Sequence, residues 1–346
     1  MTKTNAFHNR RWALKRRPNG IPTPQDFELR EGLISASDLQ PGQVLAHNLY
    51  TICAPDQRNW MNEQINFHPP LKIGDTILGP TISRIVASRH PSYPEGTLAF
   101  TLGGWCDYAV IDIASLYVPL ITYPDTVSPF DALAVIGINQ LTAYFGVNKV
   151  CQPQPGEVMV VSGAAGSTGS AAAQIGKIKG CRVIGIAGGR DKCGWLLDEC
   201  GLDEVIDYKA ENVEQRLRSL CGDKINIFYD NVGGDMLQAA LNNMAFRGRI
   251  ALCGMISGYT GAGNIKGPDN FMRMVHGTLR MEGFTPLLWP SEFPAATAEI
   301  KSWVDQGRLK HREDVREGLE NLPEIYPDLY RGKNIGTLIV KLSDGA

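Results

Sequence analysis

The sequence predicts an α/β protein with a doubly wound parallel sheet and a second, β-rich domain. Residues 1–128 are rich in Pro, Gly and short β-like runs, which predict many short strands between turns. From residue 129, buried strands alternate with helices, and this alternation predicts a parallel sheet with helices on both faces. We therefore expect one domain over 1–128 and another over 129–311, with 312–346 returning to the first.

The alternating region holds six expected strands and the helices that connect them. The strands are expected over 157–161, 181–187, 203–207, 225–229, 249–253 and 281–284. The helices are expected over 168–179, 191–200, 211–220, 235–246, 271–280 and 295–306. The strands are short apolar runs, whereas the helices carry small or apolar residues at helical spacing. A further strand over 336–341 is assigned to the first domain, because the parallel sheet already has six strands.

The composition of the chain excludes several classes of protein. The chain has 346 residues, of which 43% are hydrophobic, and its formal net charge is −2. Disordered chains are poorer in apolar residues, and binding to nucleic acid or an anionic membrane needs a strong positive field. The longest uncharged stretch, 158–176, is too rich in Gly, Ser, Thr and Gln for a bilayer helix. We therefore expect a globular protein with neither nucleic-acid nor membrane partners.

The first residues carry a basic cluster and no apolar signal segment. The cations of this cluster are Arg10, Arg11, Lys15, Arg16 and Arg17. A nucleic-acid arm is one interpretation, but the alternation of Trp12 and Leu14 with charged residues favours a solvated strand and turn. Without a signal peptide, the expected location is cytoplasmic.

The spacing of cysteines and histidines predicts no metal site. The eight cysteines include no C-x-x-C pair, and the six histidines include no H-x-x-x-H pair. Several cysteines, such as Cys181 and Cys253, fall in apolar strand contexts. We therefore expect buried free thiols in a reducing compartment and no zinc.

A glycine-rich turn follows the first strand of the alternating region. Gly163, Gly166 and Gly169 recur at every third residue, between an apolar strand and a helix. Glycines let the backbone approach a pyrophosphate, and the helix N-terminus presents N–H groups and a positive dipole end to the anion. In this context the pattern predicts nucleotide binding, although a tight structural turn can use the same residues.

The end of the second strand indicates which nucleotide is bound. Arg190 and Lys192 suit the 2′-phosphate of NADP through charge-assisted hydrogen bonds. Asp191 suits the ribose of NAD, but it also suits the cap of the following helix. The two cations therefore favour NADP over NAD. The segments 230–234 and 253–259 follow the fourth and fifth strands and are expected to line the cofactor crevice, ordinary turns being the alternative.

Several short motifs occur in an order that resembles a known family. They are Asn9-Arg10, Leu141-Thr142-Ala143-Tyr144, Val161-Ser162-Gly163-Ala164-Ala165-Gly166, Asp230-Asn231-Val232-Gly233-Gly234, Cys253-Gly254-Met255-Ile256-Ser257, Arg280-Met281-Glu282-Gly283-Phe284 and Asn334-Ile335-Gly336. Together they resemble the zinc-independent medium-chain dehydrogenase/reductases, in the branch of prostaglandin/leukotriene, plant double-bond and bacterial curcumin reductases. The resemblance covers nearly the whole chain. It implies a GroES-like β domain, made from both chain ends, beside a Rossmann domain, and we expect a homodimer.

The resemblance also implies NADPH as the cofactor and names its ligands. The pyrophosphate is expected at Gly166, Ser167, Thr168 and Gly169. The 2′-phosphate is expected at Lys192 and Tyr208. The rest of the cofactor is expected against Asn231, Cys253, Gly254, Ile256, Ser257, Tyr259, Phe284, Thr285 and Asn334. The expected contacts of the small-molecule substrate are Arg58 and Tyr50.

Members of this family reduce the double bond of enones and enals, and the same activity is expected here. A hydride is expected to reach the β-carbon, and the Tyr259 hydroxyl to stabilise the enolate, packing on the cofactor being its alternative role. A zinc-independent carbonyl or quinone reductase and a non-catalytic NADPH-binding protein are the alternative functions. The chain departs from the family pattern at Ala54 and in the segment Ile138-Asn139-Gln140, where Ile138 and Gln140 replace Met and Gly. These departures are expected near the nicotinamide and the substrate.

Overall fold

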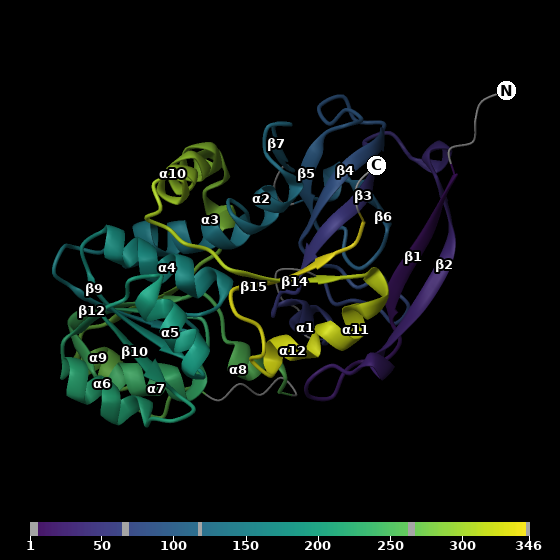
Figure 1. The fold of residues 1–346 in the computed structure, drawn as a ribbon. Coiled ribbons are helices and arrows are strands. Elements are labelled where there is room, and N and C mark those ends of the chain that lie inside the picture. The colour runs from purple at the N-terminus through teal and green to yellow at the C-terminus, as the bar shows by residue number, and fades with distance from the viewer. Residues whose placement is uncertain (1–5, 64–68, 117–119, 262–266, 344–346) are drawn as a thin grey trace. The chain divides into compact units, whose positions relative to one another are not determined.

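The computed structural model describes residues 6–63, 69–116, 120–261 and 267–343. The chain forms two compact units, one made of residues 1–134 and 313–346 and the other of residues 135–312. The first unit is rich in strands, and the second alternates strands with helices (Figure 1). The α/β fold class predicted from the sequence is therefore confirmed.

The unit of residues 135–312 is built on a parallel sheet. Over the described residues its six strands run in the order β10-β9-β8-β11-β12-β13. They are β8 (Val158–Ser162), β9 (Arg182–Ala187), β10 (Glu204–Asp207), β11 (Ile225–Asp230), β12 (Met244–Leu252) and β13 (Arg280–Gly283). All neighbouring pairs are parallel. The strand order reverses between β8 and β11, and ligands of such sheets bind at the carboxyl ends of the strands beside this point.

Helices connect these strands and bury the sheet. They are α3 (Ile138–Phe145), α4 (Ser167–Ile178), α5 (Arg190–Asp198), α6 (Val213–Cys221), α7 (Gly234–Asn242), α8 (Ile256–Tyr259), α9 (Arg273–His276) and α10 (Phe293–Asp305). Helix α3 continues into a π-helical turn, Gly146–Cys151. The core contains Val160, Ile184, Phe228 and Leu237 from the strands and α7. The central strands β8, β9 and β11 are mostly apolar because a parallel sheet is covered on both faces.

Two predicted elements of this unit differ in length from those observed. Strand β12 begins at Met244, where the expected helix over 235–246 should still run, because Met244 pairs with Ile225 ahead of a register shift. The expected helix over 271–280 shrinks to the single turn of α9. Thr278 adopts a φ of +50°, which lies outside the helical region, so the chain leaves the helix before this residue.

The unit of residues 1–134 and 313–346 contains two sheets within its described part. Strands β1 (Ala6–Leu14) and β2 (Phe27–Ser35) form an antiparallel pair. The other sheet has the order β14-β15-β3-β4-β5-β7, with β6 paired to β3. Its strands are β3 (Gln43–Ile52), β4 (Thr81–Ser88), β5 (Leu98–Thr101), β6 (Tyr108–Asp112), β7 (Ile121–Tyr123), β14 (Glu313–Glu317) and β15 (Thr337–Lys341), and its short helices are α1 (Gln57–Trp60), α2 (Pro129–Ala134), α11 (Leu322–Ile325) and α12 (Pro327–Tyr330). Strand β15 pairs with β3, so both ends of the chain share one sheet.

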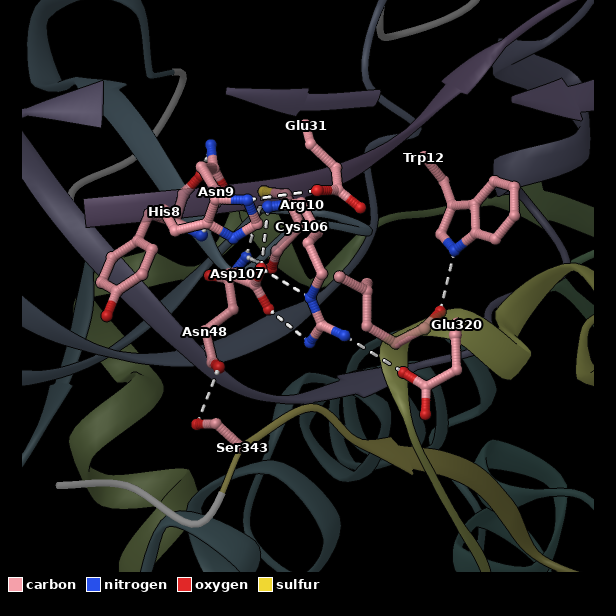
Figure 2. Close-up of polar contacts among 12 residues, drawn as sticks. His8, Asn9, Arg10, Trp12, Glu31, Asn48, Cys106, Asp107, Glu320 and Ser343 are labelled. Carbon is pink, nitrogen blue, oxygen red and sulfur yellow. Dashed lines mark hydrogen bonds and ion pairs between the residues drawn. The ribbon is translucent and has the colours of Figure 1, made fainter. Parts of the chain in front are cut away.

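Figure 2 shows how β1 is joined to the rest of this unit. The Arg10 guanidinium forms ion pairs with Asp107 at 3.0 Å and with Glu320 at 3.3 Å. The Trp12 indole N–H donates to a backbone carbonyl at 2.8 Å. Three further cations of the basic cluster bond to groups of the same unit: Arg11, Arg16 and Arg17. The cluster is thus part of a paired strand and turn, as the alternation of its residues indicates.

One helical run is long and mostly apolar. Residues 129–151 are long and apolar enough, by length and composition alone, to cross a membrane. In the folded chain, 67% of the most apolar window is buried inside the protein. Such burial is typical of the core helix of a globular protein, which passes the same test of length and composition.

Candidate functional site

The glycine-rich turn lies between β8 and α4. Gly166 caps α4, which begins at Ser167 and continues through Thr168. A side chain at Gly169 would collide with the carbonyl oxygen of Gly163, so only glycine lets the helix pack this closely on the turn. The first N–H groups of an α-helix lie outside its own hydrogen bonds and carry the positive end of its dipole. This cradle therefore fits an anion such as the pyrophosphate of a dinucleotide.

A buried carboxylate joins the ends of β8 and β11. One oxygen of Asp230 accepts hydrogen bonds from the Ser162 hydroxyl at 2.6 Å and from two backbone N–H groups of the following turn, both at 3.0 Å. Burial raises the pKa of Asp230 against the opposing effect of these bonds. Asn231 completes the link, since its amide donates to the Ser162 carbonyl at 2.7 Å. The sequence places Asp230 in the expected crevice segment 230–234, but it contains no signal of the bond to Ser162.

The loops that follow β11 and β12 are bonded to each other. The N–H groups of Cys253 and Gly254 donate to the Asp230 carbonyl at 2.9 and 3.1 Å. The Ile256 N–H and the Ser257 hydroxyl donate to carbonyls of the loop after β11, at 3.3 and 2.6 Å. The structure therefore brings these predicted residues together beside Asn231. Their contact with the cofactor stays a prediction.

Tyr259 ends α8 within this pair of loops. Its hydroxyl oxygen accepts a hydrogen bond from the Met255 N–H at 3.0 Å. The same oxygen lies close to Gly254, where an added Cβ would be 3.2 Å away. A phenol has one proton to donate and also accepts hydrogen bonds, so accepting from Met255 is compatible with donating to a further group. This is the polarity that the predicted enolate contact requires.

The ends of β9 and β10 form one polar corner. The Asp207 carboxylate accepts hydrogen bonds from the Gly189 and Lys209 N–H groups at 2.9 and 3.0 Å. The Tyr208 ring covers Gly188, where an added Cβ would come within 2.6 Å of it. Tyr208 is thus held at the loop that follows β9, close to the first turn of α5, which carries the predicted 2′-phosphate ligand Lys192.

Two ammonium groups belong to this corner. Lys192 is half-buried, and burial together with the charge of Lys209 lowers its pKa. Neighbouring cations repel each other, and an anion bound to both removes that repulsion. The corner therefore fits the 2′-phosphate predicted at Lys192 and Tyr208. Lys209 is an additional candidate that sequence reasoning misses, because its distance from Lys192 along the chain follows no known pattern.

Arg190 is the first residue of α5. It is exposed, and it lines an open hollow of α5 together with Trp195 and Asp198. Lys192 is two residues further along the helix, about 200° around its axis. Asp191 lies in the first turn of α5, whose N-cap is Gly189, so it stabilises the helix through the dipole and is not the cap itself. The two side chains therefore diverge, and of the two we propose Lys192 alone for the 2′-phosphate.

Phe284 and Thr285 follow β13. The Phe284 ring packs edge-on against Tyr229, with ring centroids 6.1 Å apart, and it closely covers Gly146. The Thr285 hydroxyl accepts a hydrogen bond from the Leu287 N–H at 3.4 Å. Both residues follow the strand next to β12, and their contact with the cofactor stays a prediction.

Three predicted site residues belong to the strand-rich unit. Asn334 is buried, and its amide donates to the Gly336 carbonyl at 2.9 Å. Tyr50 lies on β3 and packs edge-on against Phe130, with ring centroids 6.0 Å apart. The roles of Asn334 and Tyr50 stay predictions. The third residue is Arg58.

Arg58 has a structural role, which corrects its expected role as a substrate contact. The side chain is buried, with 2% of the residue exposed. Its guanidinium donates to two backbone carbonyls between β1 and β2, at 2.7 and 3.1 Å, and to the Asn62 side chain at 2.5 Å. Arg58 therefore ties the connection between β1 and β2 to α1. Burial lowers its pKa, and the sequence contains no signal of this burial.

The departure from the family pattern at Ala54 lies beside a carboxyl group with a raised pKa. The Ala54 N–H donates to the Gln57 side chain at 2.8 Å. Two residues after Ala54, burial raises the pKa of Asp56 to about 6. The cause is the loss of water around the carboxylate, which two backbone N–H groups offset only in part.

Asp56→Asn is expected to remove a pH-dependent loss of stability. A carboxyl group with a higher pKa in the folded chain contributes stability below about pH 4 and loses it as the pH rises through about 6. The full shift corresponds to about 3 kcal/mol, which partial exposure reduces to about 1–2 kcal/mol. Urea unfolding at pH 4 and pH 7 should find the variant more stable than the unchanged protein at pH 7 alone. An equal difference at both pH values would contradict this.

The donor set of the described residues does not fit zinc. Within residues 6–63, 69–116, 120–261 and 267–343, no group of three or more His, Cys, Asp or Glu side chains is placed to hold a metal ion. The eight cysteines form no disulfide bond, and burial raises the pKa of Cys53, Cys106 and Cys200 to about 12. Such thiols stay protonated and are poor ligands. Metal independence stays a prediction.

The parallel sheet, the glycine cradle and the polar corner define a dinucleotide-binding protein. Two family models match it: the N-terminal domain of oxidoreductase over residues 10–118, and the zinc-binding dehydrogenase over residues 167–302. The chain therefore combines two modules of dehydrogenases. The second description includes a metal that the donor set of the described residues does not fit.

Named relatives match nearly the whole chain. It is 35% identical over 340 residues to the NADPH-dependent curcumin reductase of Escherichia coli (strain K12), covering 97% of each chain. It is 35% identical over 327 residues to prostaglandin reductase 1 of Oryctolagus cuniculus, covering 94% of this chain and 91% of the relative. The crystal structure of CurA from Vibrio vulnificus in complex with NADPH is 33% identical, with a TM-score of 0.88 and coverage of 97% and 99%. The chain belongs to the medium-chain dehydrogenase/reductase family, in the branch of the curcumin and prostaglandin reductases, and this confirms the family predicted from the ordered motifs.

Proposed function

We propose that this chain uses NADPH to reduce the carbon–carbon double bond of α,β-unsaturated ketones and aldehydes. The observation that carries the proposal is its near-full-length similarity to named reductases of one branch. Besides the curcumin and prostaglandin reductases, these include the NADP(+)-dependent 2-alkenal reductase of Nicotiana tabacum, 32% identical over 345 residues. The names of these relatives describe small-molecule substrates, and a substrate of that kind is part of the proposal.

The cofactor has the firmest support. The curcumin reductase relative is NADPH-dependent by name, and the structural neighbour CurA is crystallised with NADPH. In this chain, the glycine cradle fits a pyrophosphate, and the corner of Lys192, Tyr208 and Lys209 fits a 2′-phosphate. The sequence prediction of NADPH is therefore confirmed. The individual ligands remain part of the proposal.

The residues around Asn231 and Tyr259 account for the chemistry proposed. NADPH, when bound, supplies the hydride that reaches the β-carbon of the substrate. Negative charge then develops on the carbonyl oxygen of the substrate, and a placed hydrogen-bond donor stabilises it. Tyr259 suits this task by its chemistry, because a phenol hydroxyl can donate a hydrogen bond as well as accept one, as its oxygen does from Met255. Protonation at the α-carbon by Tyr259 or water completes the saturated product.

The test is NADPH oxidation with a panel of enones, enals, quinones and saturated carbonyl compounds, with product analysis by mass spectrometry and NMR. The proposal expects the enone to become the saturated ketone with its carbonyl intact, and saturated carbonyl compounds to remain unreacted. An allylic alcohol as product would support the carbonyl reductase. NADPH binding without consumption by any compound would support the non-catalytic alternative.

Removal of metal ions is expected to leave the activity unchanged. The basis is the lack of zinc-ligand spacing in the sequence, together with the donor set of the described residues. Turnover of an enone is measured before and after dialysis against a strong chelator, with elemental analysis of the protein. A loss of activity that added zinc restores would refute the prediction.

The homodimer and the cytoplasmic location also remain predictions. The family resemblance predicts the homodimer, and neither property follows from the geometry of the site. Light scattering after gel filtration measures the mass of the particle in solution. A particle with twice the mass of the 37.9 kDa chain would support the homodimer.

A further inference from the structure

We propose that Asn139 is a positioning residue for the cofactor, because it orients the Ser167 hydroxyl in the glycine cradle. This inference rests on the proposed binding of NADPH. The Asn139 amide donates to the Ser167 hydroxyl oxygen at 3.1 Å, in a half-buried contact. Asn139 is the second residue of α3 and Ser167 the first residue of α4. The contact therefore joins two helices at the end of α4 that attracts anions.

The contact changes the interpretation of the segment 138–140, where Ile138 and Gln140 depart from the family pattern. The sequence places this departure near the nicotinamide and the substrate and leaves the cofactor loops untouched. In the structure, Asn139 bonds directly to the cofactor loop. The residue at position 139 is thus part of the support of the pyrophosphate cradle.

The direction of the hydrogen bond determines what Ser167 can do. A hydroxyl group has one proton to donate and two lone pairs that accept. Because Asn139 donates to the oxygen, the Ser167 proton points away from the amide nitrogen. The oxygens of a pyrophosphate are acceptors only, so an oriented Ser167 hydroxyl matches them. Because both side chains are partly buried, a water molecule that replaced the amide would not restore the full strength of this hydrogen bond.

A carboxylate at position 139 would reverse this arrangement. It has nearly the same size as the amide, but it accepts hydrogen bonds and does not donate them. The Ser167 proton would then bond to the carboxylate, and a negative charge would lie beside the pyrophosphate. Asn139→Asp therefore tests the direction of the bond, whereas Asn139→Ala tests its presence.

A double-mutant cycle measures the coupling between the two side chains. The Kd values for NADPH and NADH are measured by fluorescence for the unchanged protein, Asn139→Ala, Ser167→Ala and the double variant. Each single variant is expected to raise both Kd values about fivefold, which is the effect of one hydrogen bond. The double variant should be no weaker than the single variants. Asn139→Asp should raise both Kd values at least about 30-fold, since a hydrogen bond to a charged group is involved.

Asn242 provides a matched control. It is also a half-buried asparagine whose amide donates to a side chain, that of Glu214 at 3.0 Å, but it ends α7 and does not contact the cradle. Asn242→Ala should leave both Kd values unchanged. Thermal unfolding of every variant checks that the fold is intact, and Asn139→Asp serves if the alanine variant does not fold.

The outcomes separate this inference from the proposed function. Additive effects in the double variant, or unchanged Kd values in Asn139→Ala and Asn139→Asp, would overturn the role of Asn139 while NADPH binding by the unchanged protein stands. If the Asn139 variants weakened the binding of NADPH but not of NADH, the effect would lie at the 2′-phosphate. That result would also overturn the role of Asn139. Failure of the unchanged protein to bind NADPH would overturn the proposed function, and this inference with it.

Discussion

Alanine at both Lys192 and Lys209 is expected to raise the Kd for NADPH about 100-fold or more, and to change the Kd for NADH by less than about threefold. The two ammonium groups lie in one corner, where the charge of Lys209 lowers the pKa of Lys192. Each can form a charge-assisted bond to the 2′-phosphate, worth about 1.5–3 kcal/mol. NADH has no 2′-phosphate and cannot lose these bonds. Lys192→Ala alone should raise the Kd for NADPH about tenfold or more.

Arg190→Ala is the matched control for the loss of NADPH affinity in the lysine variants. Arg190 is a cation of the same helix, but it lines the hollow beside Trp195 and Asp198. Its removal should leave the preference for NADPH unchanged. Titration calorimetry with both cofactors gives the ratios of Kd values. An equal loss for NADPH and NADH in the lysine variants, or a loss in Arg190→Ala as large as theirs, would disprove the assignment of the 2′-phosphate corner.

The parallel sheet could be predicted because its signals are local. Runs such as residues 158–161 are apolar on both sides of the strand, which happens when both faces of a sheet are covered. The start of β12 could not be predicted in the same way. Residues 244–246 suit a helix by composition, and their strand conformation depends on the pairing of Met244 with Ile225, nineteen positions away.

The candidate site also has parts with a local sequence signal and parts that depend on contacts between distant residues. The glycine cradle and the loops after β11 and β12 can be predicted from the sequence, because close backbone approach requires glycine at fixed positions. The bond from Asp230 to Ser162 spans 68 residues, and the bond from Asn139 to Ser167 spans 28. No residue pattern encodes such pairs, since they form only when the strands and helices have packed.

Arg58 shows why a family resemblance can mislead at a single position. An arginine in a loop of a reductase suggests a contact with a polar substrate, because arginine is rarely buried without partners. Here three acceptors surround the guanidinium and offset the cost of its burial. Two of them are backbone carbonyls, which any sequence could supply. The sequence therefore gives no indication that this arginine is structural.

Tyr259→Phe is expected to lower kcat for an enone roughly 10²–10³-fold while leaving the aromatic ring in place. The variant removes the hydroxyl that is proposed to donate to the enolate oxygen as charge develops there. A donor placed before the reaction stabilises the transition state more than the neutral ground state, so kcat should fall more than the affinity for substrate. The hydroxyl also accepts from the Met255 N–H at 3.0 Å, and this bond is lost as well.

The effect of losing the Met255 hydrogen bond has to be separated from the effect of losing the enolate contact, because the Met255 bond acts on the loop. If the Met255 bond serves mainly to hold the loop, Tyr259→Phe should weaken NADPH binding and leave kcat at saturating NADPH nearly unchanged. The Kd for NADPH, measured by fluorescence, therefore decides between a catalytic and a loop-holding role. Tyr144→Phe is a control for deleting a hydroxyl, since Tyr144 bonds to Glu299 at 2.6 Å and should affect neither kcat nor the Kd. A low kcat with an unchanged Kd assigns Tyr259 to the enolate, whereas an unchanged kcat leaves it as a packing residue.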